Sequence, residues 1–117
     1  MTSKKYRSFW LAFVNITAKK GLILSDLIDL EGLPDNENYR GAWANIIVKA
    51  ETISKAIEII PLGLCELNFK IIFIDKVENI GSLINHNEIN ENVKKEVDWL
   101  LKSEYVFMIS DKLFPYE

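Results

Sequence analysis

The chain has 117 residues, of which 49% are hydrophobic and 26% charged, with a formal net charge of −3. This length predicts one globular domain over residues 1–117, and the balance of apolar and charged residues excludes a disordered chain. The acidity disfavours a dedicated nucleic-acid binder, and the single cysteine excludes an internal disulfide. No run approaches the ~20 apolar residues that cross a bilayer, so we expect a cytoplasmic protein.

The first element is a predicted strand over Tyr6 to Ala18, a segment rich in aromatic and β-branched residues. Lys19, Lys20 and Gly21 then provide a turn. Residues 22–33 fit either a second strand or a short helix, and both interpretations stay open. The sequence PDNENYRG that follows is typical of a loop.

A strand and a helix are predicted next. Residues 42–50 read as a strand, and Thr52 is placed to cap a helix over residues 51–60. Pro61 disfavours helical geometry in the residue before it, which predicts that the helix ends or kinks there. Its expected buried face is Ile53, Ala56, Ile57 and Ile60.

The last three predicted elements are a strand, a helix and a second strand. Residues 68–80 have a nearly continuous apolar centre, typical of a strand buried on both faces or central in a sheet. After a polar connection, Asn90 caps a second predicted helix over residues 91–104. Residues 105–110 then form a short strand, followed by a tail. The stripe that faces the core is Ile89, Val93, Val97, Leu100 and Leu101.

These elements predict an α+β fold. Four mainly antiparallel strands with two helices on one face form a sandwich of ferredoxin-like type.

The first candidate binding surface is the acidic stretch from Asp26 to Tyr39, which has five carboxylates and no basic residue. It lacks the alternating oxygen ligands, central glycine and terminal glutamate of a calcium loop, so no metal is expected there. Leucine and isoleucine residues interleave with the carboxylates, giving the apolar centre and charged rim of a docking surface, although a solvated loop would have the same composition. The candidate partner-binding residues are Asp26, Asp29, Glu31, Asp35, Glu37 and Tyr39.

A second acidic patch places Glu88 and Glu91 beside His86 and Trp99. At ~100° per residue, Trp99 lies about 120° from Val93 around the helix, off the buried stripe. Such a residue either packs under a neighbouring loop or reaches the surface, where tryptophan is the type most enriched in binding hot spots.

Catalytic motifs are missing from the sequence. His86 is the only histidine, and neither a zinc-ligand spacing nor a G-x-S-x-G elbow accompanies it. The five glycines form no phosphate-binding loop. We therefore expect no enzymatic activity, no catalytic residue, no metal and no cofactor. The alternative that stays open is a pair of carboxylates acting as acid and base, which no sequence motif would mark.

Two other functions compete with docking to a protein. The first strand carries basic residues around stackable aromatic rings, a composition that binds single-stranded nucleic acid. The same apolar strand could instead pair with its own copy in an oligomeric structural subunit. The residues of the nucleic-acid hypothesis are Lys4, Lys5, Arg7, Lys19 and Lys20 with Phe9, Trp10 and Phe13.

The sequence GAWANIIVKAETISKAIEII, leading into FKIIFIDKVENI within a small acidic chain with asparagine-rich loops, resembles the immunity proteins of bacterial polymorphic toxin systems such as contact-dependent inhibition. The resemblance implies a non-catalytic protein that binds one toxin domain tightly in the cell's own cytoplasm, in a 1:1 complex. The toxin would be basic, often a nuclease, and no membrane or cofactor would take part.

Overall fold

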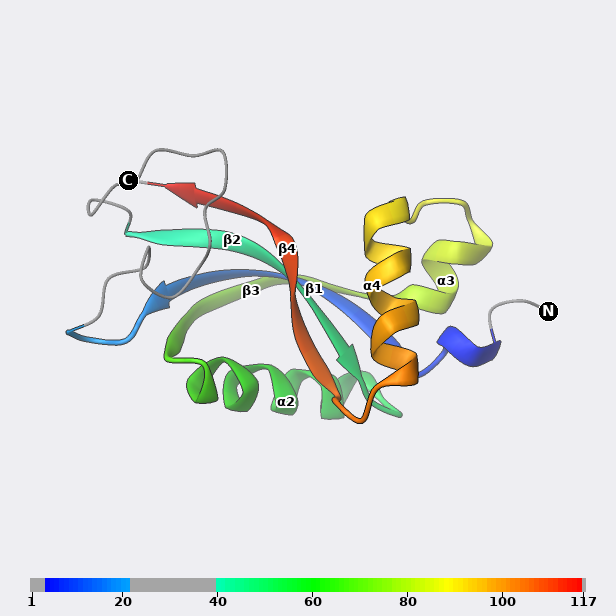
Figure 1. Cartoon of the computed structure of the whole chain (residues 1–117), viewed down its shortest axis with the longest axis horizontal. Helices are drawn as coiled ribbons and strands as arrows, with labels where there is room; N and C mark the ends of the chain where they lie inside the picture. The colour runs from blue at the N-terminus through cyan, green and yellow to red at the C-terminus, as the bar shows by residue number, and fades with distance from the viewer. Residues whose placement is uncertain (1–3, 22–39, 117) are drawn as a thin grey trace.

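The computed structural model, which describes residues 4–21 and 40–116, is an α+β structure built on one antiparallel sheet (Figure 1). Its four described strands are β1 (Phe9–Ala18), β2 (Gly41–Lys49), β3 (Phe69–Asn79) and β4 (Phe107–Tyr116), in the order β3-β1-β2-β4. All three pairings are antiparallel. This confirms the predicted α+β class and is consistent with a ferredoxin-like sandwich. The choice between helix and strand for residues 22–33 lies outside the described residues.

Strands β1 and β2 form the centre of the sheet because they are apolar on both faces. Alternate residues of a strand point to opposite faces. On one face, Ala12 and Val14 of β1 and Ile46 of β2 are fully buried. On the other face, Phe9 of β1 and Ile47 of β2 are fully buried as well. Both faces of this pair therefore need a covering layer.

Helix α2 (Ile53–Glu66) covers the first face. The hydroxyl of its N-cap, Thr52, accepts a hydrogen bond from the backbone N–H of Lys55 at 3.2 Å, as the sequence predicts. The small alanines of β1 and β2 let the helix approach the sheet closely. The residues of α2 that are buried in this core are Ala56, Ile60 and Leu64.

The predicted end of this helix before Pro61 is wrong, because α2 continues through Pro61 to Glu66. The carbonyl that loses its partner belongs to Ile57, a residue that is 43% exposed, so water can satisfy it. Burial of Leu64 in the core stabilises the turn beyond the proline. Ile53 is also 43% exposed, so neither it nor Ile57 belongs to the buried face as expected.

Helices α3 (Ile80–Asn85) and α4 (Glu91–Lys102) lie against the opposite face of the sheet (Figure 1). The helices therefore do not share one face, as the sequence analysis expected, because β1 and β2 are apolar on both sides. The stripe predicted for α4 is confirmed, since its members pack in this second core. The buried residues of this core are Tyr6, Phe9, Ile47, Ile80, Val93, Val97 and Leu100.

Helix α3 was not expected within the polar connection. Asn79 caps it by accepting a hydrogen bond from the N–H of Ser82 at 3.1 Å, and Ile80 is fully buried in the second core. Asn90 caps α4, as predicted, by accepting from the N–H of Asn92 at 2.7 Å.

Strands β3 and β4 form the two edges of the described sheet. The sequence predicts that β3 is buried on both faces or central in the sheet, but β3 is an edge strand on which Ile72 is 50% exposed and Phe73 is 46% exposed. Two register shifts interrupt its pairing with β1, and one of them leaves Ile72 without a partner residue in the ladder. β4 extends beyond the expected residues 105–110 to Tyr116 and includes Pro115, which an edge strand tolerates because half of its N–H groups need no partner in the sheet.

Tyr6 belongs to a short 3₁₀ helix, η1 (Lys4–Tyr6), rather than to the first strand as predicted. Its side chain is almost fully buried, and its hydroxyl donates a hydrogen bond to Oδ1 of Asp98 at 2.6 Å. This bond to a carboxylate, together with burial, raises the pKa of Tyr6 above its usual value of 10.0. The contact attaches the N-terminal turn to α4.

Substituting Gly63→Ala is expected to lower the free energy of unfolding by about 1–3 kcal/mol. A Cβ at Gly63 would lie 2.7 Å from the ring of Phe107 on β4, so this ring would have to shift. In an uncrowded helix position the same substitution would stabilise by roughly 0.5–1 kcal/mol. Urea unfolding shows whether Gly63→Ala lowers or raises the free energy of unfolding, with Ser54→Ala as the control at an exposed position of α2. A stabilised Gly63→Ala variant would contradict this packing.

Stability at high pH should depend on Tyr6. Its raised pKa means that the contribution of the protonated hydroxyl is fully present below pH ~10 and is lost as the pH rises through the folded-state pKa. The difference in unfolding free energy between wild type and Tyr6→Phe should therefore be constant below pH ~10 and shrink above it. Urea unfolding at a series of pH values tests this, with Tyr105→Phe as the exposed control. A difference that stays constant at all pH values would show that Asp98 does not hold this proton.

Candidate functional site

Four aromatic side chains, one from each strand, gather on the sheet face opposite α2. The rings of Phe13 and Trp43 stack, with centroids 4.9 Å apart and an interplanar angle of 11°. Phe73 meets Trp43 edge-on at 5.2 Å, and Phe114 meets Phe13 edge-on at 6.4 Å. Such pairs contribute roughly 0.5–1.5 kcal/mol beyond the burial of their area. We call Phe13, Trp43, Phe73 and Phe114 the aromatic cluster.

The pairing of the strands assembles this cluster and fixes its border. Trp43 lies opposite Phe114 across the β2–β4 pair. Beside them, the hydroxyl of Tyr116 reaches over Gly41 and donates a hydrogen bond to Oδ1 of Asn15 at 2.7 Å. A Cβ at Gly41 would lie 2.6 Å from that hydroxyl, so only glycine leaves room for this contact.

A cleft of ≈ 510 Å³ separates the aromatic cluster from α3 and α4, and it is the candidate site. Phe13, Phe114 and the amide of Asn45 lie on the sheet side of the cleft, while Leu83 and Val93 lie on the helix side. An apolar hollow with a few convergent polar groups is the usual form of a recognition site. The other polar and charged residues of the lining are Lys76, Glu78, Glu88, Asn90, Asn92 and Ser110.

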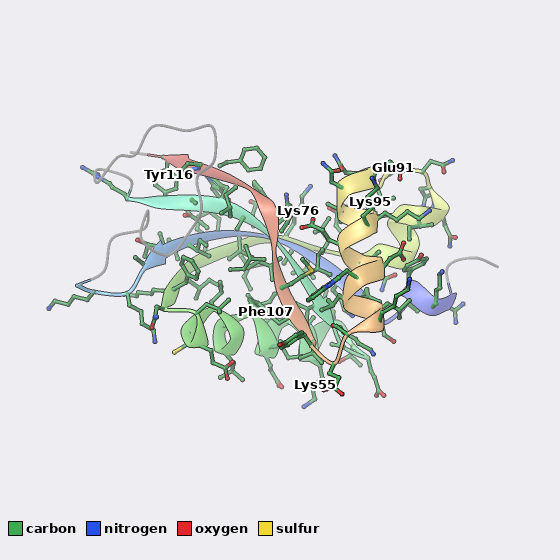
Figure 2. The ribbon with its side chains drawn as sticks, in the orientation of Figure 1. Lys55, Lys76, Glu91, Lys95, Phe107 and Tyr116 are labelled. Carbon is green, nitrogen blue, oxygen red and sulfur yellow. The ribbon has the colours of Figure 1, made fainter. Side chains whose placement is uncertain are left out.

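The charged residues of the cleft are available to a partner. Nζ of Lys76 lies 3.3 Å from Oε1 of Glu78, but the two side chains are 61% and 37% exposed, and such pairs contribute little stability. Glu88 is exposed, and no described side chain forms an ion pair with it. Glu91 is exposed in the first turn of α4, next to Asn90 and Asn92 of the lining (Figure 2). The described lining therefore holds two carboxylates, Glu78 and Glu88, against one lysine, while Glu91 outside it has Lys95 one turn away on the same helix.

The structure divides the second patch that the sequence predicts. Glu88 lines the cleft and Glu91 adjoins it. His86 ends α3, and its Nδ1 lies 2.8 Å from the carbonyl oxygen of Ser82, which gives it a local structural contact. Trp99 is eight residues beyond Glu91 on α4, about 12 Å along the helix, so it is not part of the cleft.

All residues of the first predicted patch lie outside the part of the chain that the structure describes. They are Asp26, Asp29, Glu31, Asp35, Glu37 and Tyr39.

Trp99 lines a separate hollow of ≈ 550 Å³ between the C-terminal half of α2 and the start of β4, which we call the Trp99 groove. Trp99 is 54% exposed, as its position off the buried stripe predicts, and it stacks on Tyr105 at 6.1 Å. Leu62 and Leu67 of the α2 side are also exposed. The groove and the cleft share no described lining residue.

The structure separates the residues of the nucleic-acid hypothesis. Lys5 and Arg7 lie before β1, and Lys20 lies beyond its other end, about 30 Å away for a strand of this length. Phe9 is fully buried, and Trp10 packs on the α2 side and donates from Nε1 to the carbonyl of Ala50 at 2.9 Å. The hypothesis of a first strand that pairs with its own copy is wrong, because β1 has β2 on one side and β3 on the other.

Sequence reasoning missed most of the cleft. Asn45, Lys76, Glu78 and Phe114 come from three strands, and nothing in their spacing indicates that they meet. One signal was available for Phe13, since its position in β1 alternates with the fully buried Ala12 and Val14 and therefore falls on the other face. Which residues lie opposite it depends on strand order and register.

In residues 4–21 and 40–116, no group of three or more histidine, cysteine, aspartate or glutamate side chains is arranged to hold a metal ion. Over the same residues, no helix has the length and apolar character needed to cross a membrane. Comparison of the chain with protein-family models, with curated proteins and with solved structures finds no match.

Replacing Tyr116 by Phe is expected to lower the free energy of unfolding by about 1–3 kcal/mol, because Asn15 would keep a buried oxygen without a donor. Asn15 is only 8% exposed, so water does not readily replace the lost hydroxyl. Urea unfolding of Tyr116→Phe, Asn15→Leu and the double variant measures the coupling between the two residues. The double variant should lose less than the two single losses combined. Additive losses would show that the hydrogen bond does not stabilise the fold.

Proposed function

We propose that this protein is a non-catalytic cytoplasmic binding protein that neutralises a toxin domain, and that the cleft is its docking site. The observation that carries the proposal is the combination in one hollow of aromatic rings at the base and surplus carboxylates at the rim. Interfaces concentrate their binding energy in such desolvated aromatic centres, surrounded by polar residues that exclude water.

The chemistry of the cleft favours a basic side chain of the partner. An arginine or lysine that enters the cleft would meet the rings of Phe13 and Phe114 in its lining, and ring faces attract cations. Glu78 and Glu88 lie in the same lining and would pair with its charge. Asn45 adds a polar group on the sheet side, whereas the buried hydroxyl of Ser110 already donates to Oε1 of Glu96 at 2.7 Å. Arginine suits this arrangement better than lysine, because its planar group can stack on a ring and donate to a carboxylate at once.

A basic toxin is the partner that fits this charge. A nuclease needs cationic residues to hold a phosphate backbone, and those residues would be attracted to the acidic rim. Complementary potentials raise the association rate, which matters for an inhibitor that must act before its toxin does. The chain's net charge of −3 also attracts a basic partner. The resemblance of the sequence to immunity proteins also implies a basic toxin domain as the partner, bound 1:1 by each chain.

The test compares wild type with Glu88→Lys/Glu91→Lys, which reverses the charge of the rim. Like charges across an interface cost several kcal/mol, so the affinity for the toxin should fall at least about 100-fold. The protein would be used to capture its partner from a lysate of its source cells, and the captured protein would be expressed in a host. Wild type should restore growth of that host, and the variant should not.

Glu51→Lys/Glu58→Lys is the matched control, because it makes the same change in net charge at two exposed acids outside the cleft. This control should capture and neutralise as wild type does. Neutralisation by the Glu88→Lys/Glu91→Lys variant at full strength would exclude the cleft as the interface. Capture of nucleic acid in place of a protein would contradict the proposed function itself.

A further inference from the structure

Among the residues that the structure describes, nothing pairs with the outer edge of the first half of β4. Proteins usually blunt such edges with charges, proline or bulges, because unpaired main-chain groups recruit other strands. On β3, register shifts and charged residues such as Asp75 do this. The second half of β4 has a register shift and Pro115. The segment from Tyr105 to Ile109 has neither charge nor proline.

Some backbone N–H and C=O groups of this segment have no partner in the described sheet. The N–H of Lys49 donates to the carbonyl of Val106 at 2.8 Å, next to the paired residues Val48 and Phe107. In an antiparallel ladder this makes Val48 and Phe107 a non-hydrogen-bonded pair, so the N–H and C=O of Phe107 point away from β2. By the same alternation those of Ile109 point outward, while those of Met108 face β2.

The Trp99 groove borders this edge on both sides of the sheet. Leu62 and Leu67 are exposed on the α2 side of the edge, while Trp99 and Tyr105 are exposed on the α4 side. With Val106, these residues are 47–67% exposed, which amounts to a mainly apolar surface on the order of 600 Å². This is at the upper limit of the largest patch that monomeric proteins usually leave uncovered.

We propose that a second copy of this chain docks in the Trp99 groove, with the two β4 strands paired antiparallel about a two-fold axis. Two such surfaces would bury about 1,200 Å² together, which reaches the range of specific interfaces. Glu66 is the one charged residue among the described residues of the lining, so the groove offers a charged partner little to pair with. A two-fold contact is self-complementary, and an apolar strand between apolar walls meets that requirement.

The proposed dimer leaves the cleft open, because the two hollows share no described lining residue. Each chain of the dimer would then bind one toxin domain. The dimer does not depend on the proposed function, and its test needs only the purified protein.

Sedimentation equilibrium of the full chain over a wide range of concentrations is the first measurement. Wild type should approach twice the chain mass of 13.5 kDa. Leu62→Lys places like charges across the two-fold axis and should weaken the dimer about 100-fold. Ile57→Lys is the control on the same helix, at a residue 43% exposed and outside the groove lining, and should dimerise like wild type. Tyr105→Lys is a second groove variant at a residue 65% exposed, in case Leu62→Lys perturbs the helix.

Hydrogen exchange measured by NMR then tests the strand pairing itself. In the dimer the amide protons of Phe107 and Ile109 should exchange more slowly than in Leu62→Lys, while that of Met108 should be equal in both. A wild type that stays monomeric would overturn the proposal, as would a dimer that both groove variants preserve. A dimer in which Phe107 and Ile109 stay unprotected would overturn the strand pairing. Loss of toxin capture by Leu62→Lys in a monomeric protein would assign the groove to the toxin instead.

Discussion

The two-sided burial of the β1–β2 pair is the constraint on which the rest of this structure depends. Ala12, Val14 and Ile46 face one side, Phe9 and Ile47 face the other, and all are fully buried. A sheet whose centre is apolar on both faces is stable in water only if each face is covered. Helix α2 meets this requirement on one side, and α3 with α4 meets it on the other.

The second layer covers only part of its face, and the candidate site is a consequence. α4 packs over Ile47 through Val93, Val97 and Leu100, and the aromatic cluster continues the same sheet face beyond it. The cleft lies where the helical layer gives way to the rings. Its base includes Phe13, which stacks on Trp43, and these two residues belong to the two central strands. Its charged residues come from the edge strand β3 and from the connection between α3 and α4.

α4 connects the two surfaces that the proposals assign to different partners. Its first turn adjoins the cleft, and Trp99 near its other end lines the groove. The two surfaces differ in chemistry, since the cleft combines rings with carboxylates while the groove is almost entirely apolar. This difference supports a basic toxin in the cleft and a second copy in the groove, because charge selects the first and self-complementary apolar area selects the second. Tyr6, bonded to Asp98, attaches the N-terminal turn to the middle of the same helix.

Local sequence determined the four strands, two of the three described helices and their caps at Thr52 and Asn90, because periodicity and capping are properties of neighbouring residues. It also determined that Trp99 would face away from the buried stripe. The course of α2 through Pro61 and of β4 through Pro115 was decided by the tertiary structure, through core packing beyond the first and an edge position for the second. The cleft was decided in the same way. Its described residues come from four strands, two helices and the connection between those helices, and only strand order and register bring Phe13, Asn45, Lys76 and Phe114 onto one face.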